Sequence, residues 1–218
     1  MLAHPEGEKA DATVCLGDVV GYGGRPRECL ADVRRTCRLV LQGNHDSGAA
    51  GLTSLDWFNS AGAAAISWIS STLLQEEAAW LAGLPLRAAL EGMLLCHSYP
   101  PDPGSWRYVL SSKHAVSCCR AFPGQRMIIG HTHLPAVWDC SGDWTDAESG
   151  YLPPTCVVNA GSVGQPRDGD PRAAYLLVDT SDWSFRHVRV EYDIDAAAEA
   201  IRAAGLPDSL WKRLYDGQ

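Results

Sequence analysis

Short apolar runs alternate with segments of helical periodicity in the N-terminal part of the chain. The run Ala12–Leu16 ends at Gly17-Asp18, a pattern that predicts a buried strand followed by a turn. Pro26 opens a segment whose apolar residues recur at helical spacing. Arg38–Gln42 is a second apolar run, which ends at Gly43. A strand, a helix and a strand within about thirty residues form a βαβ unit.

The middle of the chain predicts two helices and then three strands. The apolar residues of Ala61–Leu74 lie on one helical face, and Gln75–Leu81 begins with acidic residues, which the helix dipole favours. Leu84–Leu90 and Met93–His97 flank a Glu-Gly turn and predict a hairpin. Arg126–Gly130 predicts a strand that leads directly into a histidine.

The C-terminal part is predicted to be rich in strands and to end in helices. Four strands are predicted at Ala136–Asp139, Thr155–Asn159, Ala173–Asp179 and Ser184–Glu191. The polar segment Cys140–Pro154 is predicted to be a surface loop. A helix capped by Asp193 and a short helical segment, Asp208–Tyr215, end the chain. Helices between two β-rich parts predict an α/β fold, a two-sheet sandwich flanked by helices, in a single domain over residues 1–218.

The composition is that of a globular protein and excludes several function classes. Hydrophobic residues are 46% and charged residues 20%, which excludes a disordered or fibrous chain. The 18 basic and 26 acidic residues give a net charge of −8, without a block of Lys or Arg, so we expect no nucleic-acid polymer as partner. No apolar stretch approaches the roughly 20 residues of a membrane span. The first ten residues lack the features of a signal peptide. We therefore expect a soluble, cytoplasmic protein with no membrane partner.

Polar residues that can bind a metal follow four of the predicted strands. They are Asp18, Asn44, His45, His97, His131 and His133. Because ligands bind at the carboxyl ends of strands in α/β sheets, we expect these side chains to converge. Imidazole, carboxylate and amide donors suit Mn²⁺, Fe²⁺ or Zn²⁺. Each residue alone has an ordinary structural interpretation as well, because Gly-Asp is typical of turns and a lone histidine is common at a strand end.

The order of these motifs is more specific than each motif alone. Gly17-Asp18, then Gly43-Asn44-His45-Asp46, then His97, and finally Gly130-His131-Thr132-His133 each follow an apolar strand. The series resembles the calcineurin-like metallophosphoesterase superfamily. Residues 15–23 and 159–167 resemble its small bacterial phosphoesterases. The resemblance covers essentially the whole chain and implies the metallophosphoesterase fold.

The resemblance also implies a role for each site residue. Asp18 would bridge two divalent ions (Mn, Fe, Zn or similar), with Asn44, His97 and His131 completing one site and His133 belonging to the other. His45 would face the scissile phosphate, to stabilise charge or to protonate the leaving oxygen. Asp46 would hold His45 in its tautomer. A hydroxide activated by the metal ions would be the nucleophile.

Four further residues concern the substrate and the support of the site. Tyr22 stands where protein serine/threonine phosphatases of the superfamily carry a phosphate-binding Arg; it would stack on an aromatic leaving group or simply pack in its loop. Arg167 would approach the substrate phosphate or remain a solvated arginine in a turn. Asn159 and Ser162, which follow a strand, would hydrogen-bond behind the metal ligands.

The chain departs from the family pattern at its N-terminal end. The family begins with Asp-x-His on its first strand, and no aspartate here is followed two positions later by histidine. Leu2–His4 resembles the last turn of the family's first helix. We therefore expect the first strand and part of the first helix, about 20–25 residues, to be missing through a misplaced start codon or a shortened chain. One metal site would keep four ligands and the other only Asp18 and His133, so that one bound ion is the expectation.

The sequence thus predicts a hydrolase of phosphate esters that depends on divalent metal ions. Phosphate monoesters, diesters, nucleotides and dinucleoside polyphosphates are all small substrates that remain open, as does self-association. The alternative is a catalytically impaired member that acts as a binding or scaffold protein. The presence of His45, which binds no metal in the family pattern, favours the enzyme.

Overall fold

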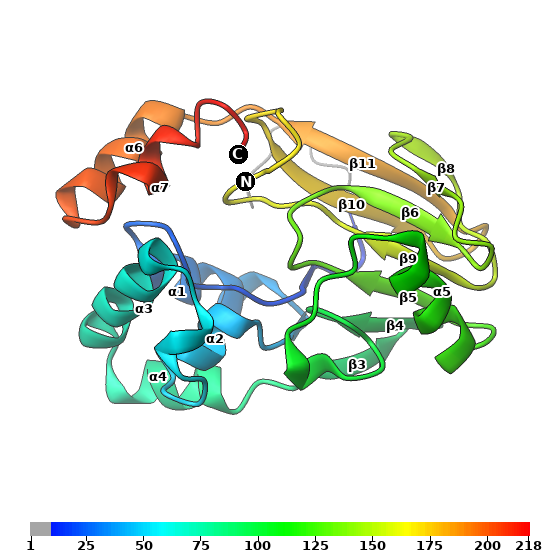
Figure 1. The fold of residues 1–218 in the computed structure, drawn as a ribbon, viewed down its shortest axis with the longest axis horizontal. Helices are drawn as coiled ribbons and strands as arrows, with labels where there is room; N and C mark the ends of the chain where they lie inside the picture. The colour runs from blue at the N-terminus through cyan, green and yellow to red at the C-terminus, as the bar shows by residue number, and fades with distance from the viewer. Residues whose placement is uncertain (1–9) are drawn as a thin grey trace.

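The largest sheet of the structure is mixed and has six strands; it is called the central sheet below and lies at the end of the molecule opposite most of the helices (Figure 1). The computed structural model describes residues 10–218, so Leu2–His4 lie outside the described residues. The strands, in spatial order, are β3 (Arg87–Leu90), β4 (Met93–Cys96), β5 (Arg126–Ile129), β9 (Cys156–Asn159), β6 (Ala136–Asp139) and β7 (Trp144–Thr145). The neighbours β4, β5 and β9 are parallel, and the other pairs are antiparallel. The parallel strands therefore end at one common edge, and this edge carries the candidate site.

Two smaller sheets accompany the central one. The parallel pair β1 (Val14–Cys15) and β2 (Leu39–Val40) comes from the predicted βαβ unit. The antiparallel sheet β10-β11-β8 contains β10 (Ala173–Asp179), β11 (Ser184–Val190) and β8 (Ser149–Tyr151). The α/β class with sheets flanked by helices is confirmed. Among residues 10–218 the strands form three hydrogen-bonded sheets rather than the expected two, because β1 and β2 pair there only with each other.

The helices gather at one end of the molecule, except for α5 (Ser112–Ala121). In Figure 1, α6 (Ile194–Ala203) and α7 (Asp208–Lys212) lie above the N-terminal helices. Those N-terminal helices are α1 (Pro26–Thr36), α2 (Asn44–Ala49), α3 (Ser60–Thr72) and α4 (Gln75–Ala82). Buried Ala65 of α3 packs with Ile201 and Leu210, which joins the C-terminal helices to the N-terminal ones. Short 3-10 turns occur at Leu55–Trp57 and Pro103–Ser105.

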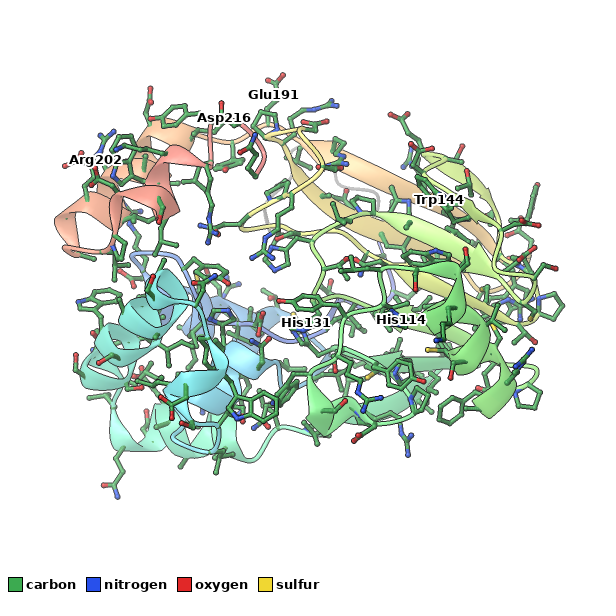
Figure 2. All side chains as sticks on the ribbon, in the orientation of Figure 1. His114, His131, Trp144, Glu191, Arg202 and Asp216 are labelled. Atoms are coloured by element: carbon green, nitrogen blue, oxygen red, sulfur yellow. The ribbon has the colours of Figure 1, made fainter. Side chains whose placement is uncertain are left out.

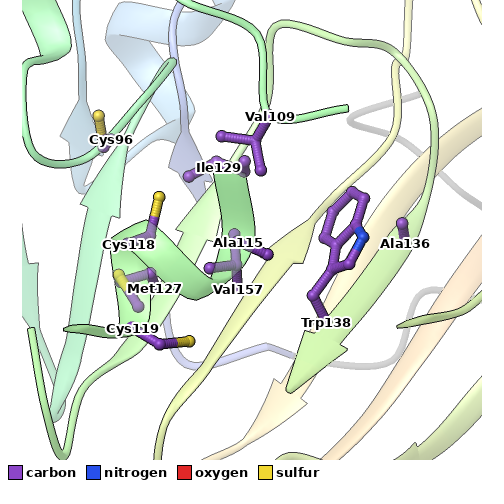
Figure 3. Close-up of a cluster of buried hydrophobic side chains, with 10 residues drawn as sticks. All are labelled: Cys96, Val109, Ala115, Cys118, Cys119, Met127, Ile129, Ala136, Trp138 and Val157. Carbon is purple, nitrogen blue, oxygen red and sulfur yellow. The ribbon is translucent and has the colours of Figure 1, made fainter. Parts of the chain in front are cut away.

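The central sheet is buried on both faces, as expected for neighbouring parallel strands. Leu95, Ile128 and Val158 belong to one apolar cluster, which Phe185 of β11 joins from the small antiparallel sheet. Residues next to them along the strands point to the opposite face, where α5 covers a second cluster (Figure 3). This second cluster contains Cys96, Val109, Ala115, Cys118, Cys119, Met127, Ile129, Ala136, Trp138 and Val157. Packing from both sides fixes the strand ends that carry His97 and His131.

Three segments differ from the sequence prediction. Asn44-His45-Asp46 forms the first turn of α2 rather than a strand-end turn, because the Asp46 carboxylate accepts the Gly43 N–H at 2.9 Å and so satisfies a free donor at the helix start. The helix α5 escaped prediction because its buried residues are only alanine and cysteine. The predicted loop Cys140–Pro154 contains β7 and β8, whose polarity reflects their position at sheet edges.

Between residues 10 and 218, no helix combines the length and the apolar character that crossing a bilayer requires.

The two-sided burial of the central sheet predicts the effect of shortening Leu95. Its side chain is 2% exposed, and the Leu95→Ala variant should lower the free energy of unfolding by about 2–5 kcal/mol. The matched control is Leu110→Ala, because Leu110 is 56% exposed and its loss should change stability by less than about 0.5 kcal/mol. Urea unfolding of both variants is the measurement. Equal losses of stability would contradict the assignment of Leu95 to the core.

Candidate metal centre

Four side chains from different strand ends meet at the edge of the central sheet. Asp18 follows β1, Asn44 begins α2, the element after β2, and His97 and His131 follow β4 and β5. Asp18, His97 and His131 each offer one ligand atom, and these three atoms lie within 4.8 Å of one another. His131 is seen in Figure 2 where the helical end of the molecule meets the sheets. Of the residues that the structure describes, this is the one group that meets the geometry of a metal site.

The ring of His97 is oriented by a backbone carbonyl and points its second nitrogen into the group. Its Nδ1 lies 3.0 Å from the carbonyl oxygen of Leu16, which can only accept, so Nδ1 carries a hydrogen. Its Nε2 lies 3.2 Å from Nδ1 of His131, 3.3 Å from Oδ1 of Asn44 and 3.4 Å from Oδ2 of Asp18. In its neutral state the ring presents a lone pair on Nε2 to these three polar atoms.

His131 is oriented in the same way. Its Nε2 lies 2.9 Å from the carbonyl oxygen of Trp106 and donates to it, which leaves a lone pair on Nδ1. The ring of Tyr108 stacks on that of His131 with a centroid distance of 4.1 Å. With both histidines neutral, four electron-rich atoms face one another with no hydrogen between them. A cation satisfies all four, and this donor set of two imidazoles, a carboxylate and an amide oxygen fits a borderline divalent ion.

Mutual electrostatics keep Asp18 and His131 in the state that a metal ion needs, whereas a metal ion must displace the proton that Asp18 favours on His97. Burial raises the pKa of Asp18, but the neighbouring His97 and His45 outweigh it and hold this pKa well below its usual range. Burial, followed by the charge of His97, lowers the pKa of His131 to about 3. Burial lowers the pKa of His97, yet the Asp18 carboxylate reverses this and raises it above its usual value. At neutral pH, Asp18 is an anion and His131 keeps its lone pair.

The backbone is strained at the same residues. Asp18, His131 and His133 have φ values of 54°, 68° and 64°, a left-handed conformation that costs of order 1–3 kcal/mol at non-glycine residues. Asn159 stabilises the strained turn after β5, because its Nδ2 donates to the carbonyl of Gly130 at 2.5 Å and to Oγ1 of Thr132 at 2.9 Å. Asn159 is fully buried and sits behind the histidines.

Two glycines allow the strand ends to approach each other. A Cβ on Gly17 would lie 2.6 Å from the backbone nitrogen of Gly43 and 2.8 Å from Nδ1 of His97. A Cβ on Gly43 would overlap the carboxylate and backbone of Asp18. This approach lets Oδ1 of Asp18 accept the N–H of His45 at 3.0 Å, so the carboxylate is held by the start of α2.

His133 lies outside the cluster of three ligand atoms that Asp18, His97 and His131 form. Its Nδ1 donates to the carbonyl oxygen of Gln165 at 2.6 Å, which leaves the lone pair on Nε2. Burial, followed by the charge of Arg167, lowers the pKa of His133 to about 4. Ser162 supports this contact, because its Oγ accepts the N–H of Gln165 at 3.0 Å. His133 is thus a neutral donor with a fixed orientation.

His45 lies beside the cluster between two aromatic rings. The centroids of Tyr22 and Phe58 are 4.4 and 5.2 Å from that of His45. Its Nδ1 is buried and has no hydrogen-bond partner among the residues that the structure describes. Burial lowers the pKa of His45, so the ring is neutral at pH 7 with hydrogen-bonding capacity left over.

The predicted hydrogen bond between Asp46 and His45 is not formed. The two oxygens of Asp46 accept instead the N–H groups of Val20 and Gly43, at 3.1 and 2.9 Å. Consecutive residues on a helix point in different directions, so Asp46 cannot follow the ring of His45. Burial and then the charge of Asp18 raise the pKa of Asp46, while the two backbone donors oppose this. Asp46 therefore holds the backbone around the site in place and does not fix the tautomer of His45.

Tyr22 and Arg167 lie together next to His45. Nη2 of Arg167 donates to the hydroxyl of Tyr22 at 3.3 Å. A further arginine, Arg213, places its guanidinium carbon 4.4 Å from the centre of the same ring. The sequence analysis missed Arg213 because it follows Trp211-Lys212 in a short terminal helix, where a basic residue is typical of a solvated surface.

The contact of Gly43 with Asp18 predicts a destabilised Gly43→Ala variant. The added Cβ must push the Asp18 turn away from α2, and the free energy of unfolding should fall by about 1–3 kcal/mol, the usual effect of overpacking. The control is Gly23→Ala, since a Cβ on Gly23 would meet nothing within 4 Å. Urea unfolding compares the two. A Gly43→Ala variant as stable as Gly23→Ala would disprove the close approach.

Comparison with known proteins agrees with this geometry. The calcineurin-like phosphoesterase superfamily domain matches residues 1–183. The chain is 38% identical to the uncharacterized protein MJ0912 of Methanocaldococcus jannaschii, over 94% of this chain and 86% of that protein. It is similar to the crystal structure of a metallophosphoesterase from Sphaerobacter thermophilus, with a TM-score of 0.88, 33% identity, and coverage of 100% of this chain and 92% of that one.

A second solved structure supports the fold alone. The hypothetical protein PH1004 of Pyrococcus horikoshii has a TM-score of 0.78 at 19% identity, with coverage of 99% of this chain and 89% of that one. The predicted resemblance and the metallophosphoesterase fold are therefore confirmed, and the chain belongs to the calcineurin-like phosphoesterase superfamily.

Proposed function

We propose that this protein hydrolyses small phosphate mono- or diesters with the help of bound divalent metal ions. The observation that supports this most directly is the convergence of four side chains that can each offer a lone pair to a metal ion. The Asp18 carboxylate, the Asn44 amide oxygen and Nδ1 of His131 all lie within 3.4 Å of Nε2 of His97. Superfamily membership supports the same class of reaction.

The donors would hold the ions in two unequal places. Asp18, Asn44, His97 and His131 would form one site, and Asp18 with His133 would contribute to a second. Mn²⁺, Fe²⁺ and Zn²⁺ all suit these donors. When bound, such ions supply positive charge to phosphoryl oxygens and lower the pKa of water towards neutrality. The carbonyls of Leu16, Trp106 and Gln165 keep each imidazole in the tautomer that can bind.

His45 is the proposed catalytic residue that touches the substrate. The rings of Tyr22 and Phe58 hold it from two sides, and its backbone N–H orients Asp18. As a neutral imidazole it can donate an N–H to a phosphoryl oxygen or to the leaving oxygen, where negative charge develops. Asp46 supports this by fixing the backbone of Val20 and Gly43 on either side.

The charge of the chain favours small substrates. The net charge of −8 repels a polyanion outside the reach of the metal ions, whereas a small ester meets mainly the local field of the site. A small phosphate ester is therefore the proposed substrate, and a nucleic-acid polymer is not.

Metal binding should stabilise the protein through Asp18. Mn²⁺ at about 100 times its dissociation constant should add about 2.7 kcal/mol to the free energy of unfolding. The isosteric Asp18→Asn variant removes the buried charge and should lose most of this gain. The control is His114→Ala, since His114 is an exposed residue of α5 and does not belong to the cluster of Asp18, His97 and His131. Thermal unfolding with and without Mn²⁺ is the measurement, and an equal shift in all three proteins would place the metal elsewhere.

Loss of His45 should impair hydrolysis without removing the metal. The His45→Asn variant should reduce kcat/KM for p-nitrophenyl phosphate or bis(p-nitrophenyl) phosphate by about 10²–10³-fold, the usual effect of removing one hydrogen-bond donor to developing negative charge. Stabilisation by Mn²⁺ should persist in this variant, and His114→Ala again serves as control. If the unchanged protein binds Mn²⁺ but hydrolyses neither compound, the enzyme proposal fails and the binding or scaffold alternative gains support.

A further inference from the structure

Two arginines converge on the ring of Tyr22 beside the candidate metal centre. The guanidinium carbons of Arg213 and Arg167 lie 4.4 and 5.9 Å from the centre of the ring, and Nη2 of Arg167 donates to the Tyr22 hydroxyl. The other side of this contact is His45, whose centroid lies 4.4 Å from that of Tyr22. The guanidinium groups of Arg167 and Arg213 therefore contact the same ring that packs against His45, the proposed catalytic residue.

Neither of these arginines has a carboxylate partner in the part of the chain that the structure describes. Within residues 10–218, neither forms an ion pair with a carboxylate, whereas Arg27 pairs with Glu77 and Arg189 with Asp168. Arg213 is half-buried, and its Nε and Nη2 are buried with no hydrogen-bond partner in the described part of the chain. Leaving buried donors of a cation without an acceptor is destabilising. An anion between the two guanidinium groups would supply the missing acceptors.

The two arginines are built into the same framework as the metal centre. Gln165 accepts from Nδ1 of His133 through its carbonyl, and its Nε2 donates to the carbonyl of Leu210 in α7 at 3.0 Å. Leu210 and Leu214, which precede and follow Arg213 in the sequence, are both buried. The N–H of Arg167 donates to the carbonyl of His133 at 3.3 Å. Arg167 is thus tied to His133 through the backbone, and the segment that carries Arg213 is tied to it through Gln165.

We propose that Arg167 and Arg213 form an anion subsite for a phosphoryl group adjacent to the scissile one. No hydrogen bond or ion pair joins either guanidinium to Asp18, Asn44, His97 or His131 among the described residues, so the subsite lies next to the metal donors rather than at them. The planar donor fork of arginine matches phosphate oxygens. The substrate class is then a compound with two linked phosphoryl groups, such as a nucleoside diphosphate, rather than a simple monoester. This inference rests on the proposed function for the scissile group.

Direct binding tests the subsite independently of hydrolysis. The probe is inorganic pyrophosphate, titrated calorimetrically into the metal-free full chain. The Arg213→Met and Arg167→Met variants should each bind it at least tenfold more weakly. Arg35→Met is the matched control, because Arg35 is an exposed arginine on α1 that pairs with Asp32, and its affinity should not change. Unchanged affinity in both single variants overturns the inference.

A conservative variant separates loss of charge from loss of fold. Methionine keeps an unbranched apolar stem against Tyr22, and unfolding in urea shows whether α7 tolerates it. Arg213→Lys keeps the positive charge but lacks the fork, so it should bind pyrophosphate more weakly than the unchanged protein and more tightly than Arg213→Met. If Arg213→Lys and Arg213→Met are equally weak but both are destabilised, the arginine is structural and the subsite is rejected.

Kinetics distinguish failure of the subsite from failure of the proposed function. With Mn²⁺ present, Arg213→Met should lower kcat/KM for ADP at least tenfold more than kcat/KM for p-nitrophenyl phosphate. Hydrolysis of both compounds with an unchanged ratio overturns the subsite alone. Absence of metal-dependent hydrolysis of either compound overturns the proposed function, and the pyrophosphate titration then decides on the subsite by itself.

Discussion

The site depends on the close approach of the Asp18 turn to the first turn of α2. Gly43 lies so near Asp18 that no side chain fits between them. In this position the Asp18 carboxylate accepts the N–H of His45 with one oxygen and reaches Nε2 of His97 with the other. A single contact between two short loops thus sets the start of α2, the direction of the carboxylate and its distance from the histidines of the central sheet.

The electrostatics of the site follow from burying this carboxylate among imidazole rings. The carbonyls of Leu16 and Trp106 each take one ring hydrogen, so the lone pairs of His97 and His131 must point inward. Such an arrangement is stable only when positive charge is shared among the inward atoms. A proton on His97 supplies it in part, which is why Asp18 raises the pKa of this histidine. A divalent cation supplies it fully, so the arrangement favours cation binding at the expense of stability without one.

The sequence was informative where chemistry follows directly from strand ends. A polar residue at the end of an apolar run predicted the positions of Asp18, His97 and His131, and the structure places their ligand atoms within 4.8 Å of one another. The sequence did not predict contacts that depend on the direction in which a side chain points. Asp46 follows His45 in the chain, yet its carboxylate binds Val20 and Gly43, since adjacent helical residues diverge. The helix α5 was missed for a different reason, because its buried residues Ala115, Cys118 and Cys119 have helical spacing but are too small to stand out as an apolar face.

Arg213 was the residue least predictable from the sequence, because its role depends on how α7 packs against the rest of the chain. The match to the superfamily ends at residue 183, so α6, α7 and Arg213 lie beyond it, whereas all the metal donors lie within it. The link between the two parts is Gln165, which contacts His133 on one side and Leu210 of α7 on the other. On the proposed assignment, the strand ends carry the class of reaction and the C-terminal helix carries the choice of substrate. A change in α7 can then alter which phosphate compound is accepted without moving any residue that holds the metal ions.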